Sequence, residues 1–587
     1  MLYILIIIVC NLVYNLVKFE ISTNLKPIIE IISVDSMAFV QAMNTPTVKV
    51  GVNGADVYTE EGVGDYRVSL FTMLNRGLSG DYIQEYVAKV FSSGKADEIC
   101  DMFVMAFQTR DIRGGKGERK LFYEFMAALY KHDRELVKRT LTLIPEYGCW
   151  RDMWELLKYN LQSEDDVFEI VVKVFKADLE AYKAEERGKK LSLLAKWLPR
   201  EKSGMYPGLA LKLANFIYAD MPSERSRIVK YRKDVSMLNK ALKTVEINMC
   251  GKIWQEIKPE AVPGRCLKIH TKAFLNERLK AKKGDEEKKG DEEKLRYPDN
   301  EDRLQCRLNF QDFIYGLSTG EKKAHGANVV MPHELVVKAL NSNTSNDELA
   351  INQGQWESIR EETLKLGGLG KSLAMCDFSG SMCGLPKLIS LALGILVSEI
   401  NHEIFKDHIL TFDSDPKWHS FSGKKTLKEK LDSIEDNLGQ GTSTNFFKAC
   451  MCILDKMKEH RVPVGEEPED LIVLTDMGFD STKERRSDKW CTQLELIRNK
   501  FNEASQEVWG SSIGWKVPRI VIWNLSAKYA DFHAKADQEG VVQLSGWSPS
   551  ILTALQKGGV QVMTPYQGMR AVLDDKRYDA VRELSRR

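Results

Sequence analysis

The stretch that decides the fold of half the chain is KSLAMCDFSGSM, residues 371–382. It opens with a short apolar run and ends in a polar loop that holds Asp377, Ser379 and Ser381. An apolar run of this length, without polar alternation, is typical of a strand buried on both faces of a parallel sheet. We therefore expect a strand over the apolar part and a loop at its carboxyl end.

Further runs of the same kind follow this one at regular intervals. They read DHILTFDS (407–414), DLIVLTDM (470–477), PRIVIWNL (518–525) and GVVQLSG (540–546). Helical patterns such as GLPKLISLALGILVSEI (384–400) lie between them. Strands that alternate with helices predict a doubly wound, Rossmann-like α/β domain, which we place over residues 356–582.

Oxygen-bearing side chains follow two of these strands, and a third group lies between them in GQGTSTNFFKAC (439–450). Ligands of doubly wound folds bind at the carboxyl ends of the strands, so these groups should lie close together. Carboxylate and hydroxyl oxygens suit Mg²⁺ or Mn²⁺. The alternative is that they only cap the following helix. The candidate ligands are Asp377, Ser379, Ser381, Asp476 and either Thr442 or Thr444.

The order of these segments, DxSxS, then a Gly-rich loop with Thr, then TD, resembles the metal-ion-dependent adhesion site (MIDAS) of von Willebrand factor A domains. The resemblance implies that Ser379, Ser381 and one threonine bind the ion directly. It implies that Asp377 and Asp476 hold the ion through water, leaving one position for an acidic group of a ligand. The family pattern GGTNxxxA favours Thr444, since Ala449 follows it by five residues.

The spacing of the other reactive residues in the sequence does not indicate a further metal or catalytic site. We expect Asp413 and Asp415 to be loop residues, and the nine histidines form no HxxxH or HxH set. No catalytic base, nucleophile or cofactor loop accompanies the metal motif. The sequence therefore predicts a protein that is not an enzyme, with no evident small-molecule substrate.

Before residue 345 the sequence shows helical patterns rather than strands alternating with helices. Stretches such as DYIQEYVAKVF (81–91), ADEICDMFVMAFQTR (96–110) and ERKLFYEFMAALYKH (118–132) place apolar residues at helical spacing. Many short amphipathic helices predict an α-helical repeat domain, of HEAT-like type, over residues 52–345. A tandem GDEEK predicts a solvated charged insertion, residues 280–300, that carries no chemistry.

Charge is unevenly distributed along the chain. The net charge is +1, yet residues 196–280 hold 18 Lys and Arg against 8 Asp and Glu, a local +10. The run ERSRIVKYRK (224–233) combines phosphate-pairing groups with an aromatic side chain that could stack on a base. The loop RDIRGGKGERK (110–120) could bring backbone N–H groups to a phosphate. A solvated helix face is the alternative for each run. The candidate RNA contacts are Arg113, Lys116, Arg119, Lys120, Arg225, Arg227, Lys230, Tyr231, Arg232 and Lys233.

The whole series of motifs resembles an uncharacterised family that joins a TROVE-like helical domain to a C-terminal von Willebrand factor A domain. It is more distantly similar to the Ro autoantigen, whose helical repeats form a ring that binds structured and misfolded RNA. The resemblance covers residues 52–582 and rests on RDIRGGKGERKLFYEF, LIPEYGCWRDMWELL, AKWLPREKS, KYRKDVSMLNKALKTVE, MPHELVVKAL, CDFSGSM, GTSTNFFKA and GVVQLSGWSPSILTAL.

Length and composition set the remaining limits. The 587 residues, 43% hydrophobic and 28% charged, exclude disordered, collagen-like and multi-span membrane classes. Eleven cysteines without a CxxC pair argue against a disulfide framework or zinc finger and favour a reducing, cytoplasmic location. The apolar residues 2–17 leave open a signal, an anchor, or a start at Met37 that makes residues 1–36 an over-called extension.

The sequence thus favours a non-enzymatic RNA-binding protein, a ribonucleoprotein component of Ro type, with a divalent-metal site in its α/β domain. The rival hypothesis is a protein-interaction adaptor whose metal captures an acidic group of a partner protein. The two differ in whether RNA binds the basic helical region.

Overall fold

The computed structural model describes most of the chain from residue 46 to 586. The ranges that it does not describe are 1–45, 160–163, 185–189, 279–294, 325, 327–328, 366, 368, 413, 435–443, 482–491, 511–513, 553–554, 556–563 and 587. The predicted leader and most of the charged insertion therefore lie outside the described residues. Within the described ranges, no helix is both long enough and apolar enough to cross a membrane.

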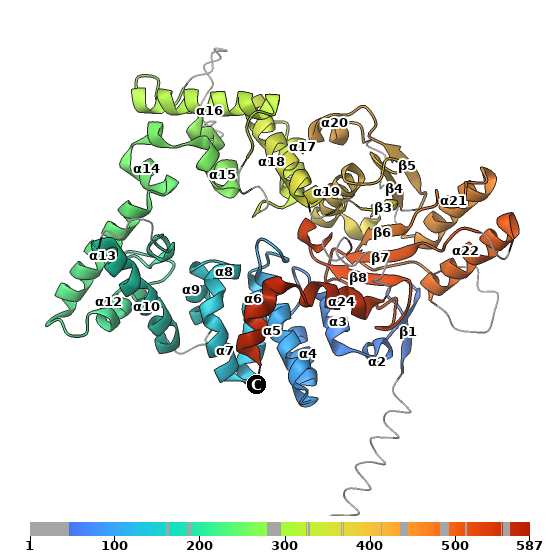
Figure 1. The fold of residues 1–587 in the computed structure, drawn as a ribbon, viewed down its shortest axis with the longest axis horizontal. Coiled ribbons are helices and arrows are strands. Elements are labelled where there is room, and N and C mark those ends of the chain that lie inside the picture. The colour runs from blue at the N-terminus through green and yellow to red at the C-terminus, as the bar shows by residue number, and fades with distance from the viewer. Residues whose placement is uncertain are drawn as a thin grey trace, which may run out of the picture.

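The N-terminal part is helix-rich, as the amphipathic patterns predict (Figure 1). The predicted runs at 81–91, 96–110 and 118–132 form α4, α5 and α6. The helices of this part are α2 (Glu60–Val63), α3 (Tyr66–Met73), α4 (Gly80–Ser92), α5 (Ala96–Arg110), α6 (Lys120–His132), α7 (Arg134–Thr140), α8 (Ile144–Tyr147), α9 (Arg151–Lys158), α10 (Glu164–Lys183), α11 (Leu194–Trp197), α12 (Leu209–Ile217), α13 (Glu224–Leu242), α14 (Val245–Gly251), α15 (Gly264–Phe274), α16 (Glu301–Thr319), α17 (Pro332–Leu340) and α18 (Asn346–Lys365).

The C-terminal part is an α/β unit built on a six-stranded sheet of order β5-β4-β3-β6-β7-β8. All neighbours are parallel except β4 and β5. Its strands are β3 (Ser372–Asp377), β4 (His408–Phe412), β5 (Lys417–Ser420), β6 (Asp470–Thr475), β7 (Arg519–Asn524) and β8 (Val541–Ser545). Its helices are α19 (Leu385–Glu399), α20 (Leu427–Asp432), α21 (Phe446–Glu459), α22 (Gln493–Trp509), α24 (Pro565–Leu573) and α25 (Asp579–Ser585).

The five apolar runs all form strands, so the prediction of an α/β domain with a mainly parallel sheet is confirmed. The sixth strand, β5, is short, half-exposed and antiparallel, and its sequence KWHS carries no apolar run. From the central strand β3 the chain passes to β4 on one side and later to β6 on the other. The order of strands therefore reverses between β3 and β6, where doubly wound folds bind ligands.

Alternate side chains of the sheet pack into two apolar layers. Leu373 and Met375 pack with α21 and α22 on one face, whereas Ala374 and Cys376 pack with α19 on the other. A side chain at Gly394 of α19 would approach Cys376 Sγ to 2.3 Å. Glycine therefore allows α19 to lie close against β3, and the sheet is covered on both faces.

The first and last elements cross between the two predicted domains. The hairpin β1 (Val48–Val50) and β2 (Asp56–Tyr58) precedes the helices, and Tyr58 N–H donates to Phe532 O of the α/β part at 2.7 Å. In the other direction, α25 packs against α5 and α7. The α19 face of the sheet also shares one continuous apolar core with the helices. The predicted ranges 52–345 and 356–582 therefore share elements and a core rather than packing as two separate units.

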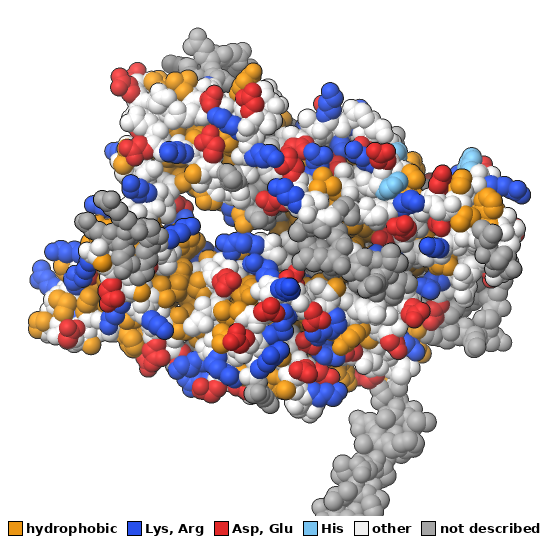
Figure 2. Space-filling model, in the orientation of Figure 1, with side chains coloured by type: hydrophobic (Ala, Val, Ile, Leu, Met, Phe, Trp, Pro, Cys, Tyr) orange, Lys and Arg blue, Asp and Glu red, His pale blue; other side chains and the backbone are white. Residues whose placement is uncertain are grey.

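The helical part returns to the α/β part at both of its ends. Near its start, α3 packs on β8, and near its end α17 and α18 pack on α19 and α20. The helices between these contacts curve around an open centre (Figure 1). Figure 2 shows that side chains leave this centre hollowed, with Lys and Arg side chains around its rim. The described chain thus forms a closed ring of helices completed by the α/β part.

Candidate metal centre and nucleic-acid interface

Asp377 is the last residue of β3, and its carboxylate is completely buried. Its Oδ1 accepts the backbone N–H of Ser379 at 2.9 Å, and its Oδ2 accepts the hydroxyl of Thr475 at 2.6 Å. Thr475 ends the neighbouring strand β6. The carboxylate is therefore held in one orientation by the two strands that flank the reversal point.

The two serines of the DFSGSM loop lie beside each other. Ser379 Oγ and Ser381 Oγ are 3.1 Å apart, and Ser379 is almost completely buried. Hydroxyl oxygens at this separation can bind the same cation from one side. The structure therefore brings the two predicted hydroxyl ligands together next to Asp377.

Asp476 follows β6 and supplies the second buried carboxylate. Its Oδ1 accepts the N–H of Gly478 at 3.3 Å, whereas its Oδ2 is buried and has no hydrogen-bond partner in the described part of the chain. Burial raises the pKa of Asp476, and hydrogen bonds from Ser381 and Gly478 act in the opposite direction. Burying a carboxylate oxygen without a hydrogen-bond partner costs free energy, so a cation or a proton bound to this atom would stabilise the site.

The two carboxylates repel each other. Burial raises the pKa of Asp377 to about 7, and the negative charge of Asp476 acts in the same direction. A divalent cation would offset the cost of burying the two carboxylates and their mutual repulsion, because its charge would compensate theirs. It would also give Asp476 Oδ2 a binding partner. The described residues contain no group of three or more His, Cys, Asp or Glu that could hold a metal. Hydroxyl groups would therefore have to supply the remaining ligands.

The predicted threonine is connected to this site through the loop after β6. Thr444 is buried, and its backbone N–H donates to Asp480 Oδ2 at 2.6 Å. Thr442 lies outside the described residues, as does Asp413. Asp415 is exposed and pairs with Lys448 at 3.1 Å, which agrees with the prediction of a loop residue.

The glycine-rich loop after α5 differs from the prediction of a phosphate-binding turn. Its backbone N–H groups are used internally: Lys116 N–H donates to Gln108 O at 3.0 Å and Glu118 N–H to Thr109 O at 2.8 Å. A Cβ atom at Gly115 would lie 2.0 Å from Gln108 O. Glycine is therefore required for a tight backbone crossing, and the phosphate interpretation of this loop is wrong.

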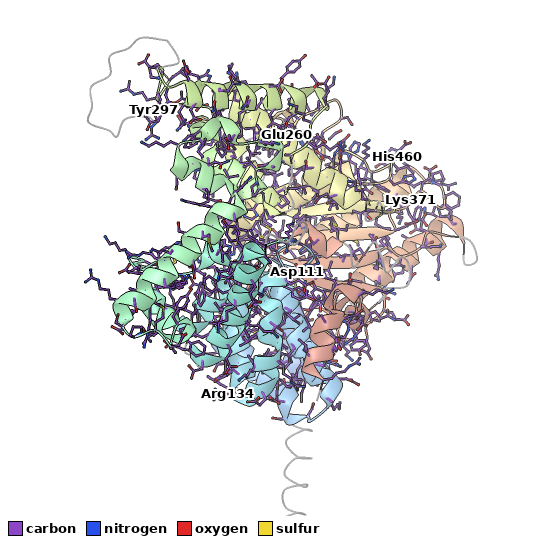
Figure 3. The ribbon with its side chains drawn as sticks, turned by 60° about the vertical axis from the view of Figure 1, so that its left-hand side comes forward. Asp111, Arg134, Glu260, Tyr297, Lys371 and His460 are labelled. Carbon is purple, nitrogen blue, oxygen red and sulfur yellow. The ribbon has the colours of Figure 1, made fainter. Side chains whose placement is uncertain are left out.

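Lys116 joins the two parts of the molecule. The side chain is completely buried, and its Nζ donates to Leu74 O at 2.9 Å and to Ser545 Oγ of β8 at 2.7 Å. Burial lowers the pKa of Lys116 to about 7. The prediction that Lys116 contacts RNA is wrong, because the folded protein leaves it no exposed surface. Figure 3 shows the neighbouring Asp111 at the same central junction.

The remaining predicted contacts of this loop lie at the surface. Arg119 and Lys120 are exposed at the start of α6, with Lys120 Nζ 3.4 Å from Glu124. Arg113 is exposed as well, but its guanidinium donates to Glu146 O at 3.0 Å. The loop therefore offers a few separate cations rather than a binding surface.

On α13 the helical period divides the basic run into two faces. Tyr231 is buried, and its hydroxyl donates to Pro199 O at 2.9 Å, so the prediction that it stacks on a base is wrong. Arg227 donates to Met221 O at 2.9 Å, and Lys230 pairs with Asp234 at 2.8 Å. These groups stabilise the helix and its neighbours.

The other face of α13 is exposed and basic, as Figure 2 shows at the outer edge of the ring. Arg225, Arg232 and Lys233 lie on it, and Arg232 has a weak ion pair with Glu201 at 3.4 Å between two exposed side chains. A groove of about 600 Å³ runs beside them. Its lining residues are Tyr182, Val229, Arg232, Lys233, Ser236, Met237 and Lys240.

Five of the seven lining residues were not predicted as contacts, and two of these five, Lys240 and Tyr182, carry a positive charge or an aromatic ring. Lys240 follows Lys233 by seven residues, two helical turns, so helical spacing alone could have assigned it to the exposed face. Tyr182 comes from α10, and no local pattern connects it to α13. The structure thus replaces Tyr231 by Tyr182 as the aromatic residue beside the exposed cations.

Comparison with known proteins adds two findings. Residues 371–581 match a domain family described as a domain of unknown function, DUF7788. The chain is also similar to a protein of Acanthamoeba polyphaga mimivirus described as uncharacterized, with 26% identity over 525 residues that cover 86% of this chain and 83% of that protein. The DUF7788 match begins one residue before β3 and therefore includes the whole candidate metal site.

Proposed function

We propose that this protein is a non-enzymatic RNA-binding protein of Ro type, with a TROVE-like, HEAT-like helical ring and a von Willebrand factor A domain that carries a MIDAS. In this proposal the α13 groove binds RNA through phosphate contacts and base stacking. Mg²⁺ or Mn²⁺ binds at the reversal point of the sheet, held by Asp377, Ser379, Ser381, Thr444 and Asp476.

The observation that carries RNA binding is the composition of the α13 groove. Arg232, Lys233 and Lys240 place three exposed cations along one helix face, and Tyr182 lies beside them. Cations along a groove bind successive phosphates, and an exposed aromatic ring stacks on bases of any sequence. This combination supports binding of single-stranded RNA with little sequence preference.

The metal part of the proposal is supported by Asp476 Oδ2, which has no hydrogen-bond partner among the described residues, and by the two neighbouring serine hydroxyls. A bound divalent ion would supply a positive charge that attracts a phosphate or a carboxylate of a ligand. The protein groups would orient that ion and exclude water from the buried carboxylates.

A matched pair of triple variants tests the RNA proposal. Arg232→Glu, Lys233→Glu and Lys240→Glu together should weaken binding of unrelated RNA sequences by at least about tenfold in filter binding at low salt. The control replaces three exposed lysines of the α/β part, Lys406, Lys424 and Lys425, by Glu and changes the net charge equally. The control should bind nearly as the unmodified protein does. Equal binding by both variants would refute the groove as the RNA site.

The second candidate function is the protein-interaction adaptor, which is favoured by the same Asp476 Oδ2, without a hydrogen-bond partner in the part of the chain that the structure describes. A metal held there would accept a carboxylate of a partner protein. In that case an acidic peptide should bind only with Mg²⁺ present, and purified protein should carry no nucleic acid by ultraviolet absorbance. RNA binding at low salt that survives removal of Mg²⁺ would exclude the adaptor as the main function.

A further inference from the structure

The loop that follows Asp476 is held by a segment more than 400 residues earlier in the chain. Asn53, at the tip of the β1–β2 hairpin, donates from its side-chain Nδ2 to Gly478 O at 2.7 Å. Its backbone O accepts the N–H of Ser481 at 3.1 Å, and Gly54 forms a β-bridge with Asp480. The N-terminal hairpin therefore clasps the metal-site loop from residue 478 to residue 481.

Asp480 connects this loop to the threonine segment through hydrogen bonds in both directions. Its carboxylate accepts the Thr444 N–H at 2.6 Å, and its own N–H donates to Thr444 O at 3.1 Å. A pair of such bonds fixes both the distance and the orientation of two backbones. The segments that carry Asp476 and Thr444 are thus joined to each other through one residue, by its side chain and its backbone.

The loop also holds a backbone conformation that needs support. Met477 has φ of +76°, in the left-handed region that side chains other than glycine rarely adopt. Its carbonyl oxygen lies 2.8 Å from His533 Nε2 of a fully buried ring, and its N–H donates to Thr475 Oγ1 at 3.2 Å. Strain of this kind persists only where surrounding contacts determine the conformation, and it is typical of ligand sites.

We propose that Asp480 is a positioning residue for the divalent cation and that the Asn53 clasp supports it. Asp480 sets the Thr444 segment at a fixed distance from Asp476, so that the ligands of two loops converge before the ion arrives. Asn53 keeps the loop in the conformation that Asp480 needs. This inference deepens the metal part of the proposed function and rests on it.

Mn²⁺ binding to the full chain, measured by calorimetry, tests the inference with four variants. Asp480→Ala should weaken binding by at least about tenfold, the range expected when a group that orients a ligand is removed. Asp480→Asn keeps an oxygen acceptor for the Thr444 N–H and should restore affinity to within about threefold of the unmodified protein. Asn53→Ala should weaken binding by about threefold to fivefold, the size of one neutral hydrogen bond.

The control is Asp455→Ala, which removes an exposed carboxylate from α21, nine residues or about 14 Å along the helix from its first residue, Phe446, at 1.5 Å per residue. It should bind Mn²⁺ unchanged. Thermal unfolding without metal identifies any variant whose folding is impaired; if Asp480→Ala is such a variant, Asp480→Asn and Asn53→Ala decide the outcome.

The outcomes separate this inference from the metal site itself. No Mn²⁺ binding by the unmodified protein would refute the site and the inference together. Normal binding by the unmodified protein and by a folded Asp480→Ala variant would refute only the positioning role. Equal losses in Asp480→Asn and Asp480→Ala would show that Asp480 acts through its charge rather than through the Thr444 hydrogen bond, which also overturns the inference.

Discussion

The carboxyl ends of β3 and β6 and the exposed face of α13 both carry charged side chains, but different surroundings stabilise these charges. At the ends of β3 and β6, Asp377 and Asp476 are buried together, and Asp476 Oδ2 has no hydrogen-bond partner in the described part of the chain. On α13, Arg232 and Lys233 lie in solvent, which satisfies them without any ligand. A buried charge without a partner therefore points to a specific ligand, whereas exposed charges point only to the kind of ligand that could bind.

The largest effect is expected at the buried carboxylates, Asp377 and Asp476. Mg²⁺ at 100 times its dissociation constant should stabilise the protein by about 2.7 kcal/mol. Asp377→Asn keeps the shape of the side chain but removes its charge, and it should weaken Mg²⁺ binding by about 10- to 100-fold. Thermal unfolding with and without Mg²⁺ measures both effects. Equal stabilisation of the variant and the unmodified protein would show that the carboxylates do not hold a metal.

Lys116 extends the comparison, because it is buried like the carboxylates but has three hydrogen-bond acceptors: Leu74 O, Ser545 Oγ and, at 3.5 Å, Phe71 O. Its pKa is lowered to about 7 by burial, so the unfolded chain binds the proton more tightly than the folded protein does. Stability should therefore rise between pH 7 and the ordinary pKa of lysine near 10.4.

The Lys116→Met variant isolates this contribution. Between pH 7 and pH 9 the unfolding free energy of the unmodified protein should rise by about 2 kcal/mol relative to that of the variant. Urea unfolding at both pH values measures the difference. Parallel pH dependence in the two proteins would mean that Lys116 stays charged in the folded state, held by its three acceptors.

The smallest effects are expected on α13, where variants of the two faces should change different properties. Arg227→Ala removes donors to Met221 O and Ala219 O and should lower stability by about 1 kcal/mol with RNA affinity unchanged. Arg232→Ala should do the reverse, lowering RNA affinity several-fold with stability unchanged. Unfolding and filter binding of both variants check this division. If Arg227→Ala weakens RNA binding more than Arg232→Ala does, the assignment of the faces is wrong.

The sequence predicted the sheet and the loop residues of the candidate site because both depend on local patterns. Buried strands are continuous apolar runs, and a strand end fixes the place of the residues that follow it, so Asp377, Ser379 and Ser381 could be grouped without a structure. The short edge strand β5 carries no such pattern, and it was missed.

Contacts between distant segments were beyond reach of the same reasoning. Asn53 and Gly478 meet only because the N-terminal hairpin crosses to the α/β part, and nothing in either segment indicates the other. Two of the RNA contacts predicted from the basic runs were wrong for a related reason. Charge alone does not show which side chains a tertiary contact buries, as Lys116 and Tyr231 illustrate.

The most direct test of the account is the salt dependence of binding between the unmodified protein and a labelled single-stranded RNA, measured by fluorescence anisotropy. Three phosphate contacts from the α13 groove predict that log K falls with log salt with a slope of about −2, at about −0.7 per contact. The Arg232, Lys233 and Lys240 triple Glu variant should lose most of that slope. Absence of RNA binding by the unmodified protein at the lowest salt, or an equal slope in the variant, would contradict the account.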